Sequence, residues 1–228
     1  MLWLSLEFPA LGRDAVAADA HTAVLASHGS HRWLIAAVAH TGGKALPAGL
    51  PLADARARRP ELLTLPRQRA AEQEALLALA HRVYRFGSPV VAEIIEVPEP
   101  YVVPRWRVSV EIGASLSLFG GIEPLRRQLL QNLLEHEHAP GHGIAPSRSA
   151  AGLLAQLGDT LPCTERSALG DRLQSLPVSA LPWPQAVLRA LGSVGLQRLG
   201  ALFALPRATL VQRFGQTVSD EALHERGA

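Results

Sequence analysis

The chain has 228 residues, of which 48% are hydrophobic and 18% charged, a composition typical of a folded protein rather than a disordered one. Its formal net charge of +2 permits contact with nucleic acid without requiring it. The one cysteine, Cys163, excludes an intrachain disulfide and suits a reducing compartment, and no apolar run approaches the length of a membrane span. We therefore expect a cytoplasmic protein that does not contact a membrane.

The first expected elements are a strand over residues 2–8 and a second strand over 33–38. A short helix is expected over 50–62, because Pro51 fits a first helical turn and Pro60 ends a helix.

Residues 68–86 have the apolar spacing of a helix. Strands near 90–97 and 106–112 follow, and the second alternates apolar with polar residues, which predicts a strand buried on one face. The apolar positions of this strand are Trp106, Val108, Val110 and Ile112.

A helix over 122–136, a strand over 142–145 and a helix over 149–157 complete this part. The order strand, helix, strand, strand, helix, strand, helix is typical of a ferredoxin-like α+β sheet.

From residue 171 onward the spacing is helical, which places a domain boundary near 160–175. Residues 188–215 are expected to form short helices joined by glycine turns, with Gly195 ending one helix and Gly200 allowing two helices to approach closely.

Segments in chain order resemble the Y-family translesion DNA polymerases, specifically their ImuB-type branch. They are LWLSLEFP (2–9), LPAGLPLADARARRPEL (46–62), VSVEIGASLSLFGG (108–121) and LGSVGLQRLGALFALPRATLVQRFG (191–215).

The resemblance implies an α+β fold with a ferredoxin-like palm, a small fingers insertion and a small all-α thumb that has helix-hairpin-helix-like turns. The expected limits are 1–10 and 66–165 for the palm, 11–65 for the fingers and 170–228 for the thumb. The little-finger domain that follows the thumb in the family is expected to be absent from this chain.

Y-family polymerases hold two divalent ions on palm carboxylates, and the motif registers place the family's metal-ligand positions on Ser5, Trp106 and Arg107. None of these is an acid, and an arginine repels a cation. We therefore expect no catalytic residue, no metal and no cofactor. Glu7 and Glu111 are the carboxylates close enough to rebuild a site, in which case Mg²⁺ would be the cofactor.

The tyrosine and arginine with which the family holds the incoming triphosphate fall on Ala39 and Gly42, which have no side chain able to bind phosphate. The first glycine hairpin of the family's thumb falls near 181–185, where the sequence has two prolines around a tryptophan. Prolines lack the amide donors that such a hairpin offers to a phosphate.

Weak DNA contacts that do not depend on sequence are expected in the thumb. Arginines there are equally typical of a solvated helix face, so both interpretations stay open. The residues concerned are Gly195, Arg198, Arg207 and Arg213.

A group of histidines and the cysteine are not expected to have a catalytic role. His136, His138 and His142 follow one another near a helix end, and a polar loop is favoured over a metal site because the first two point to different sides. Cys163 has no matched histidine and is expected in an ordinary loop.

The resemblance implies a non-catalytic scaffold for damage-induced translesion synthesis and mutagenesis in DNA repair and the SOS response. Its implied partners are DNA, a RecA-like accessory protein of the ImuA type, an error-prone replicative-type polymerase alpha subunit and the sliding clamp, whose binding motif lies beyond the thumb and is absent here. An active error-prone DNA polymerase with a displaced metal site is the alternative, so enzymatic activity stays open. A decayed product without function is the third interpretation.

Overall fold

The computed structural model describes residues 1–39, 44–97, 99–135 and 139–206. The chain forms two compact units, the first made of residues 1–7, 83–91 and 108 onward, the second of 8–82 and 92–107. These units divide the chain at other points than the predicted palm, fingers and thumb, whose limits stay a prediction.

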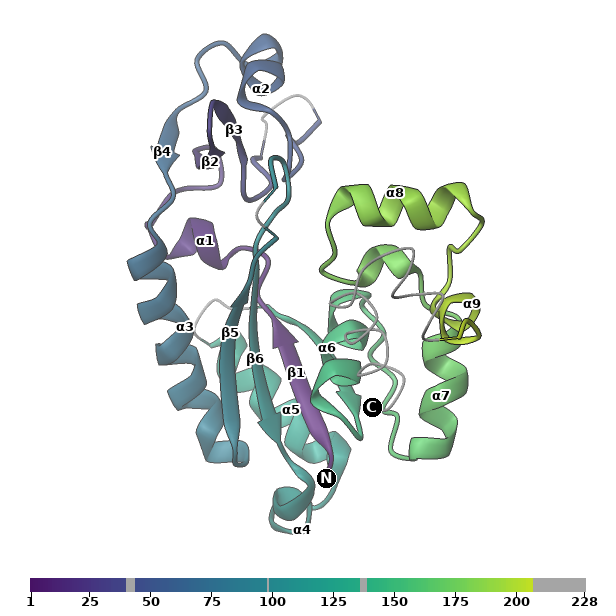
Figure 1. The fold of residues 1–228 in the computed structure, drawn as a ribbon. Helices are drawn as coiled ribbons and strands as arrows, with labels where there is room; N and C mark the ends of the chain where they lie inside the picture. The colour runs from purple at the N-terminus through teal and green to yellow at the C-terminus, as the bar shows by residue number, and fades with distance from the viewer. Residues whose placement is uncertain (40–43, 98, 136–138, 207–228) are drawn as a thin grey trace. The chain divides into compact units, whose positions relative to one another are not determined.

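The main sheet has four strands in the order β5-β6-β1-β7 (Figure 1). The strands are β1 (Trp3–Glu7), β5 (Val90–Ile95), β6 (Arg105–Glu111) and β7 (Gly141–Ala145). In the chain, α3 (Arg69–Val83) leads into β5, α5 (Ile122–Leu134) lies between β6 and β7, and α6 (Arg148–Gln156) follows β7. With β1 central and paired antiparallel to β7, this is the ferredoxin-like arrangement that the element order predicted.

Short helical turns join these elements. They are η1 (Tyr84–Phe86), η2 (Gly113–Ser115) and α4 (Leu116–Phe119). No helix among the described residues is both long and apolar enough to cross a membrane.

The polar residues of β6 are buried, which corrects the expectation of a strand buried on one face. Arg107, Ser109 and Glu111 are 7%, 0% and 8% exposed, and their apolar neighbours in the strand are equally covered. The alternation therefore does not separate solvent from core. It separates two covered faces, one of which is lined by polar groups that need partners.

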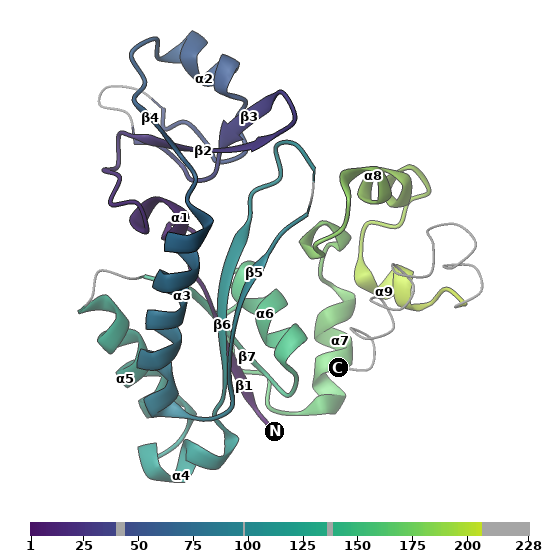
Figure 2. The same ribbon diagram turned by 60° about the vertical axis from the view of Figure 1, so that its left-hand side comes forward.

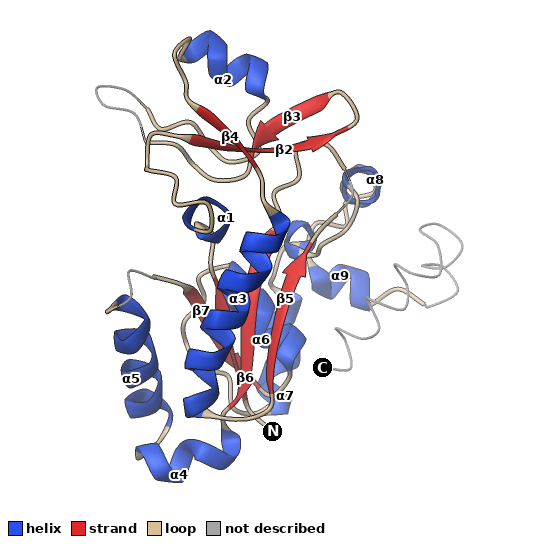
Figure 3. Ribbon diagram, turned by 90° about the vertical axis from the view of Figure 1, so that its left-hand side faces the viewer, coloured by secondary structure: helices blue, strands red, loops and turns tan. Residues whose placement is uncertain are grey.

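The second unit contains a small sheet in the order β3-β2-β4 (Figures 2 and 3). Its strands are β2 (Ala23–His28), β3 (His31–Leu34) and β4 (Thr64–Pro66), with β2 antiparallel to β3 and parallel to β4. The helices α1 (Leu11–Asp14) and α2 (Leu52–Arg58) belong to the same unit, and α2 covers this sheet through a core shared with Leu25, Leu34 and Leu46.

The sequence predicted this unit incompletely. The strand expected at 33–38 ends at Leu34, and β2 and β4 were missed. The predicted helix over 50–62 is shorter, at Leu52–Arg58, although Pro51 lies at its start as expected. Ile35, Ala36 and Val38 are buried, but the described residues from 35 to 39 form one bridge, Val38 to Leu46, so their hydrophobicity indicates core packing rather than a strand.

In the first unit, α6 lies directly on β7. Gly143 makes this possible, because an added Cβ would lie 2.5 Å from the Ala155 nitrogen and 2.6 Å from the Ala151 oxygen. The buried face of α6 is built from small residues and leucines, and Ser147 begins the helix by accepting a hydrogen bond from the Ala150 amide.

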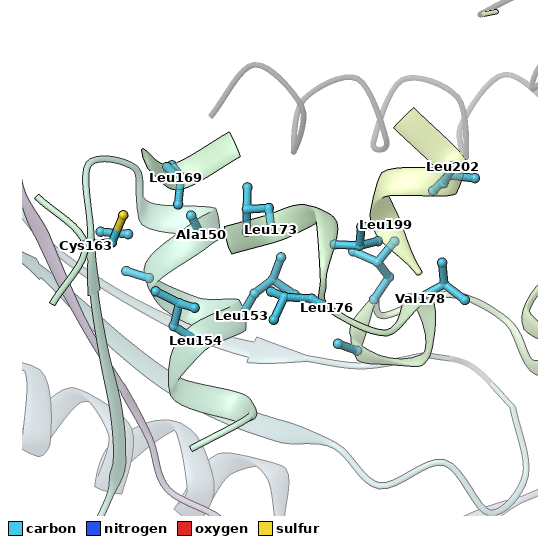
Figure 4. Close-up of a cluster of buried hydrophobic side chains, with 14 of the residues drawn as sticks. Ala150, Leu153, Leu154, Cys163, Leu169, Leu173, Leu176, Val178, Leu199 and Leu202 are labelled. Atoms are coloured by element: carbon cyan, nitrogen blue, oxygen red, sulfur yellow. The ribbon is translucent and has the colours of Figure 1, made fainter. Parts of the chain in front are cut away.

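The helices after β7 share one hydrophobic core with α6 (Figure 4). They are α7 (Arg166–Gln174), η3 (Val178–Ala180), α8 (Gln185–Ser193) and α9 (Leu199–Phe203). Cys163 is part of this core and is 5% exposed. Gly200 lets α9 approach α7, since its Cβ would meet Gln174 at 2.9 Å, and Gly195 has a φ of +80° after α8, so both predicted glycine roles are confirmed.

We predict that Gly143→Ala destabilises the protein by about 1–3 kcal/mol, because the new methyl group collides with the backbone of α6, which cannot move independently of the core. Urea unfolding followed by circular dichroism measures the change. Gly170→Ala is the matched control: Gly170 lies in α7 with open space around it, so alanine there should be neutral or stabilising. Equal midpoints for Gly143→Ala and the unmodified chain would refute this account of the β7–α6 contact.

Candidate functional site

The first expected metal-ligand position, Ser5, lies in the middle of β1 opposite Gly143 of β7. Its side chain is fully buried, and its Oγ lies 2.8 Å from the Oγ of Ser109 on β6. Two neutral hydroxyls that bond each other offer little to magnesium, which prefers anionic oxygens. The pair joins two strands of the sheet through side chains.

The second position, Trp106, is 1% exposed. Its indole Nε1 donates a 2.9 Å hydrogen bond to Oε2 of Glu72 on α3. Its ring also lies against Gly12, where an added Cβ would be 2.6 Å from the ring. The indole therefore has a packing role and a polar role, and both are structural.

Glu72 itself is fully buried and is held by Arg67. The Nε and Nη2 atoms of Arg67 donate to the two carboxylate oxygens at 2.7 and 2.6 Å, a bidentate geometry that fixes both side chains. Burial works to lower the pKa of Arg67, but the hydrogen bonds and charges of Glu72 and Glu96 outweigh it and raise the pKa above its ordinary value. Arg67 thus stays charged and balances Glu72.

The third position, Arg107, also has an acidic neighbour. Its Nη1 lies 3.6 Å from Oε1 of Glu93, and the arginine side chain is 9% exposed. The two β6 positions where the sequence resemblance predicts metal-binding acids thus hold an indole and a cation, and each has an acid of the protein beside it. Both acids are matched to donors of the protein.

Glu111 is engaged by the backbone. Its Oε1 accepts hydrogen bonds from the amides of Leu2 at 2.8 Å and Gly113 at 3.1 Å, which ties the start of the chain to the turn after β6. Glu7 ends β1 and is 8% exposed. Both acids are therefore buried. They do not lie on a solvated strand face, which would have been another reason for acidic residues at these positions.

The predicted triphosphate positions are described in part. The Ala39 amide donates to the Ala20 oxygen at 2.6 Å, and the Ala39 oxygen accepts from Arg59 Nη1 at 3.1 Å. Gly42 lies outside the described residues.

The thumb-like turn after α8 uses its amides internally. Those of Val194, Gly195, Leu196 and Gln197 donate to carbonyls between Leu191 and Gly195. Arg198 Nη1 donates to the Ser175 oxygen at 2.5 Å. Contact with a phosphate at this turn would therefore rely on side chains. Arg207 and Arg213 lie outside the described residues, and DNA binding by all four predicted positions stays a prediction.

Of the predicted histidine group, His142 is described, whereas His136 and His138 are not. Burial, and next the charge of Arg126, lower the pKa of His142. Across the described ranges, no three histidine, cysteine, aspartate or glutamate side chains gather as metal ligands would.

Glu72 was not predicted as a buried functional residue, although the sequence held a signal for it. Glu72 lies on the same face of α3 as the apolar stripe of Leu76, Leu79 and Val83, one turn before Leu76. A charged residue on such a stripe must be buried with a partner, and Arg67 shortly before the helix was available.

We predict that Glu72→Gln lowers the free energy of unfolding by about 3 kcal/mol, because it leaves Arg67 buried without its full counter-charge. Glu74→Gln, an exposed change of the same kind on the same helix, should stay within about 0.5 kcal/mol of the unmodified chain. Chemical denaturation of both variants side by side decides. Equal effects would show that the buried ion pair does not stabilise the fold.

No protein-family model matches the chain. Protein ImuB of Caulobacter vibrioides, in each of two strains, is 33% identical over 167 residues, which are 73% of this chain and 34% of ImuB. The chain thus matches about a third of the length of these curated relatives.

Among solved structures, DinB from Sulfolobus solfataricus is similar with a TM-score of 0.71 at 16% identity, covering 100% of this chain and 67% of that chain. An insertion ternary complex of Dbh DNA polymerase gives a TM-score of 0.70 at 15% identity, with the same coverage. The α+β fold is therefore that of Y-family DNA polymerases, and the sequence relation to ImuB is closer than either structural one. On these grounds the chain belongs to the ImuB-type branch of the Y-family DNA polymerase-like proteins and corresponds to their N-terminal part.

Proposed function

We propose that this chain acts in DNA-damage tolerance as a DNA-contacting scaffold that does not itself synthesise DNA. The proposal rests on the side chains at the three positions where the sequence resemblance predicts the family's metal ligands. Ser5 bonds another hydroxyl, Trp106 bonds Glu72, and Arg107 lies beside Glu93. A two-metal reaction requires carboxylates that converge on both ions, and these side chains instead serve the fold.

Contact with DNA is the second part of the proposal. The related Dbh structure is a ternary complex of a DNA polymerase, and this chain shares its fold. Non-catalytic contact with the phosphate backbone needs only positively charged groups on a stable framework. Such contact would be weak, independent of base sequence and sensitive to salt.

The scaffold role would extend to protein partners. By its relation to ImuB, the chain would act with a RecA-like accessory protein, an error-prone polymerase alpha subunit and the sliding clamp. The matched part is about a third of ImuB, so contacts made by the rest of that protein are not carried over to this chain.

We expect no primer extension above background when the full chain is incubated with primer-template DNA, Mg²⁺ and all four deoxynucleotides. Glu111→Gln is the diagnostic variant, because its amide oxygen still accepts the Leu2 and Gly113 hydrogen bonds while the charge that a metal needs is lost. Extension by the unmodified chain that disappears in this variant would favour the alternative function, an active error-prone polymerase with a displaced metal site.

We expect primer-template DNA to bind with an affinity that falls as salt rises, measured by fluorescence anisotropy. Replacing Arg207 and Arg213 by glutamine together should lower the slope of log K against log salt by up to about 2, since each phosphate contact contributes about 0.9. The paired control replaces Arg56 and Arg58, exposed on α2, in the same way. If both pairs weaken binding equally, net charge and not a thumb contact explains it.

A further inference from the structure

A groove with a volume of about 660 Å³ lies within the second unit. One wall comes from β2 and β3 and includes Ser27, His28 and Trp33. The opposite side comes from the segment that leads into α3 and from the chain after β5, and it includes Arg67, Arg69 and Glu96. Neither the polymerase-like chemistry nor the predicted thumb contacts use this groove.

Two arginines converge on one carboxylate at the edge of the groove. Arg67 Nη2 lies 2.6 Å from Oε1 of Glu96, and Arg69 Nη2 lies 2.8 Å from Oε2. The Arg69 side chain is 70% exposed and that of Glu96 is 32% exposed. The carboxylate is therefore held at the protein surface, where a soluble anion can compete for the same two donors.

The two arginines are prepared to bind an oxyanion. Arg67 is fixed by its bidentate bond to buried Glu72. The part of its guanidinium that faces Glu96 therefore keeps its orientation when the Glu96 carboxylate moves away. Arg69 is the first residue of α3, and the positive end of a helix favours an anion there. Planar guanidinium groups suit the several oxygens of a phosphate as well as the two of a carboxylate.

Glu96 is the first residue of the loop between β5 and β6, which is seen beside β3 in Figure 2. Trp33 Nε1 donates to the Val102 oxygen at 3.0 Å, and the Tyr101 hydroxyl lies 2.8 Å from His31 Nδ1. The Tyr101 ring also meets the rings of Trp33 and His31 edge-on. These contacts lie at exposed or half-buried positions, and the Glu96 side chain is itself partly exposed, so its withdrawal does not require the core of the unit to open.

We propose that Arg67 and Arg69 form a phosphate-binding site that Glu96 occupies as an internal competitor in the free protein. A phosphate group of a nucleic-acid backbone or of a free polyphosphate would take the place of the Glu96 carboxylate. The nucleic-acid source rests on the proposed DNA-contacting function, whereas the phosphate site does not.

The test uses the full chain and Glu96→Gln, which removes the competing charge and keeps the side-chain length. Inorganic tripolyphosphate binding is measured by calorimetry, and binding of a fluorescein-labelled thymidine oligonucleotide by anisotropy. Glu96→Gln should tighten both by about tenfold, the effect of one charge-assisted contact. Glu74→Gln, with the same change in net charge, should leave both within about twofold. Adding Arg69→Gln to Glu96→Gln should remove the gain.

Tighter binding of tripolyphosphate alone would support the site and assign it to free polyphosphates. Equal affinities of Glu96→Gln and Glu74→Gln for both probes would overturn the proposal. If Glu96→Gln does not fold, Arg69→Gln in the unmodified chain decides: it should weaken tripolyphosphate binding at least about threefold more than Arg56→Gln. No difference between these two would also overturn the proposal. Primer extension by the chain would refute the scaffold function but leave this result unaffected.

Discussion

A carboxylate that water cannot reach needs its counter-charge inside the protein, and Glu72 is such a group. Arg67 supplies the charge and Trp106 supplies a further donor. Through these bonds the start of α3 is joined to β6, so Trp106, at a predicted metal-ligand position, holds two elements together. Returning an acid to that position would place a second carboxylate beside Glu72 and remove the indole that packs on Gly12.

The acids on and near the polar face of β6 are also matched to groups of the protein itself. Metal-dependent polymerases balance a cluster of acids with divalent cations, whereas this chain balances its acids with its own arginines and amides. Glu93 lies beside Arg107, Glu96 pairs with Arg67 and Arg69, and Glu111 accepts two backbone amides. These pairings agree with the scaffold proposal and with a groove whose arginines would become available to external anions once Glu96 leaves.

The sequence predicted the framework better than the site. Helices α5 and α6 are clearly amphipathic, the spacing of Leu76, Leu79 and Val83 indicates α3, and the residues of β6 alternate, so these elements and their order could be predicted. Strands β2 and β4 could not, because short strands in an alanine-rich segment depend on tertiary pairing that leaves little local pattern. The partners of Trp106 and Arg107 come from other elements of the chain, so no local spacing reveals them. The burial of Glu72 was predictable in principle, since it interrupts an apolar helix face.

The covered position of Cys163 has a practical consequence for measuring motion in this protein. It is the one thiol in the sequence and lies within the core shared by α6, α7 and α9. A maleimide reagent meets an introduced surface cysteine far sooner than a thiol enclosed by leucines. Pairs of fluorophores or spin labels can therefore be placed on chosen elements, such as the β5–β6 loop and α2, without first deleting a native cysteine and disturbing the packing around it.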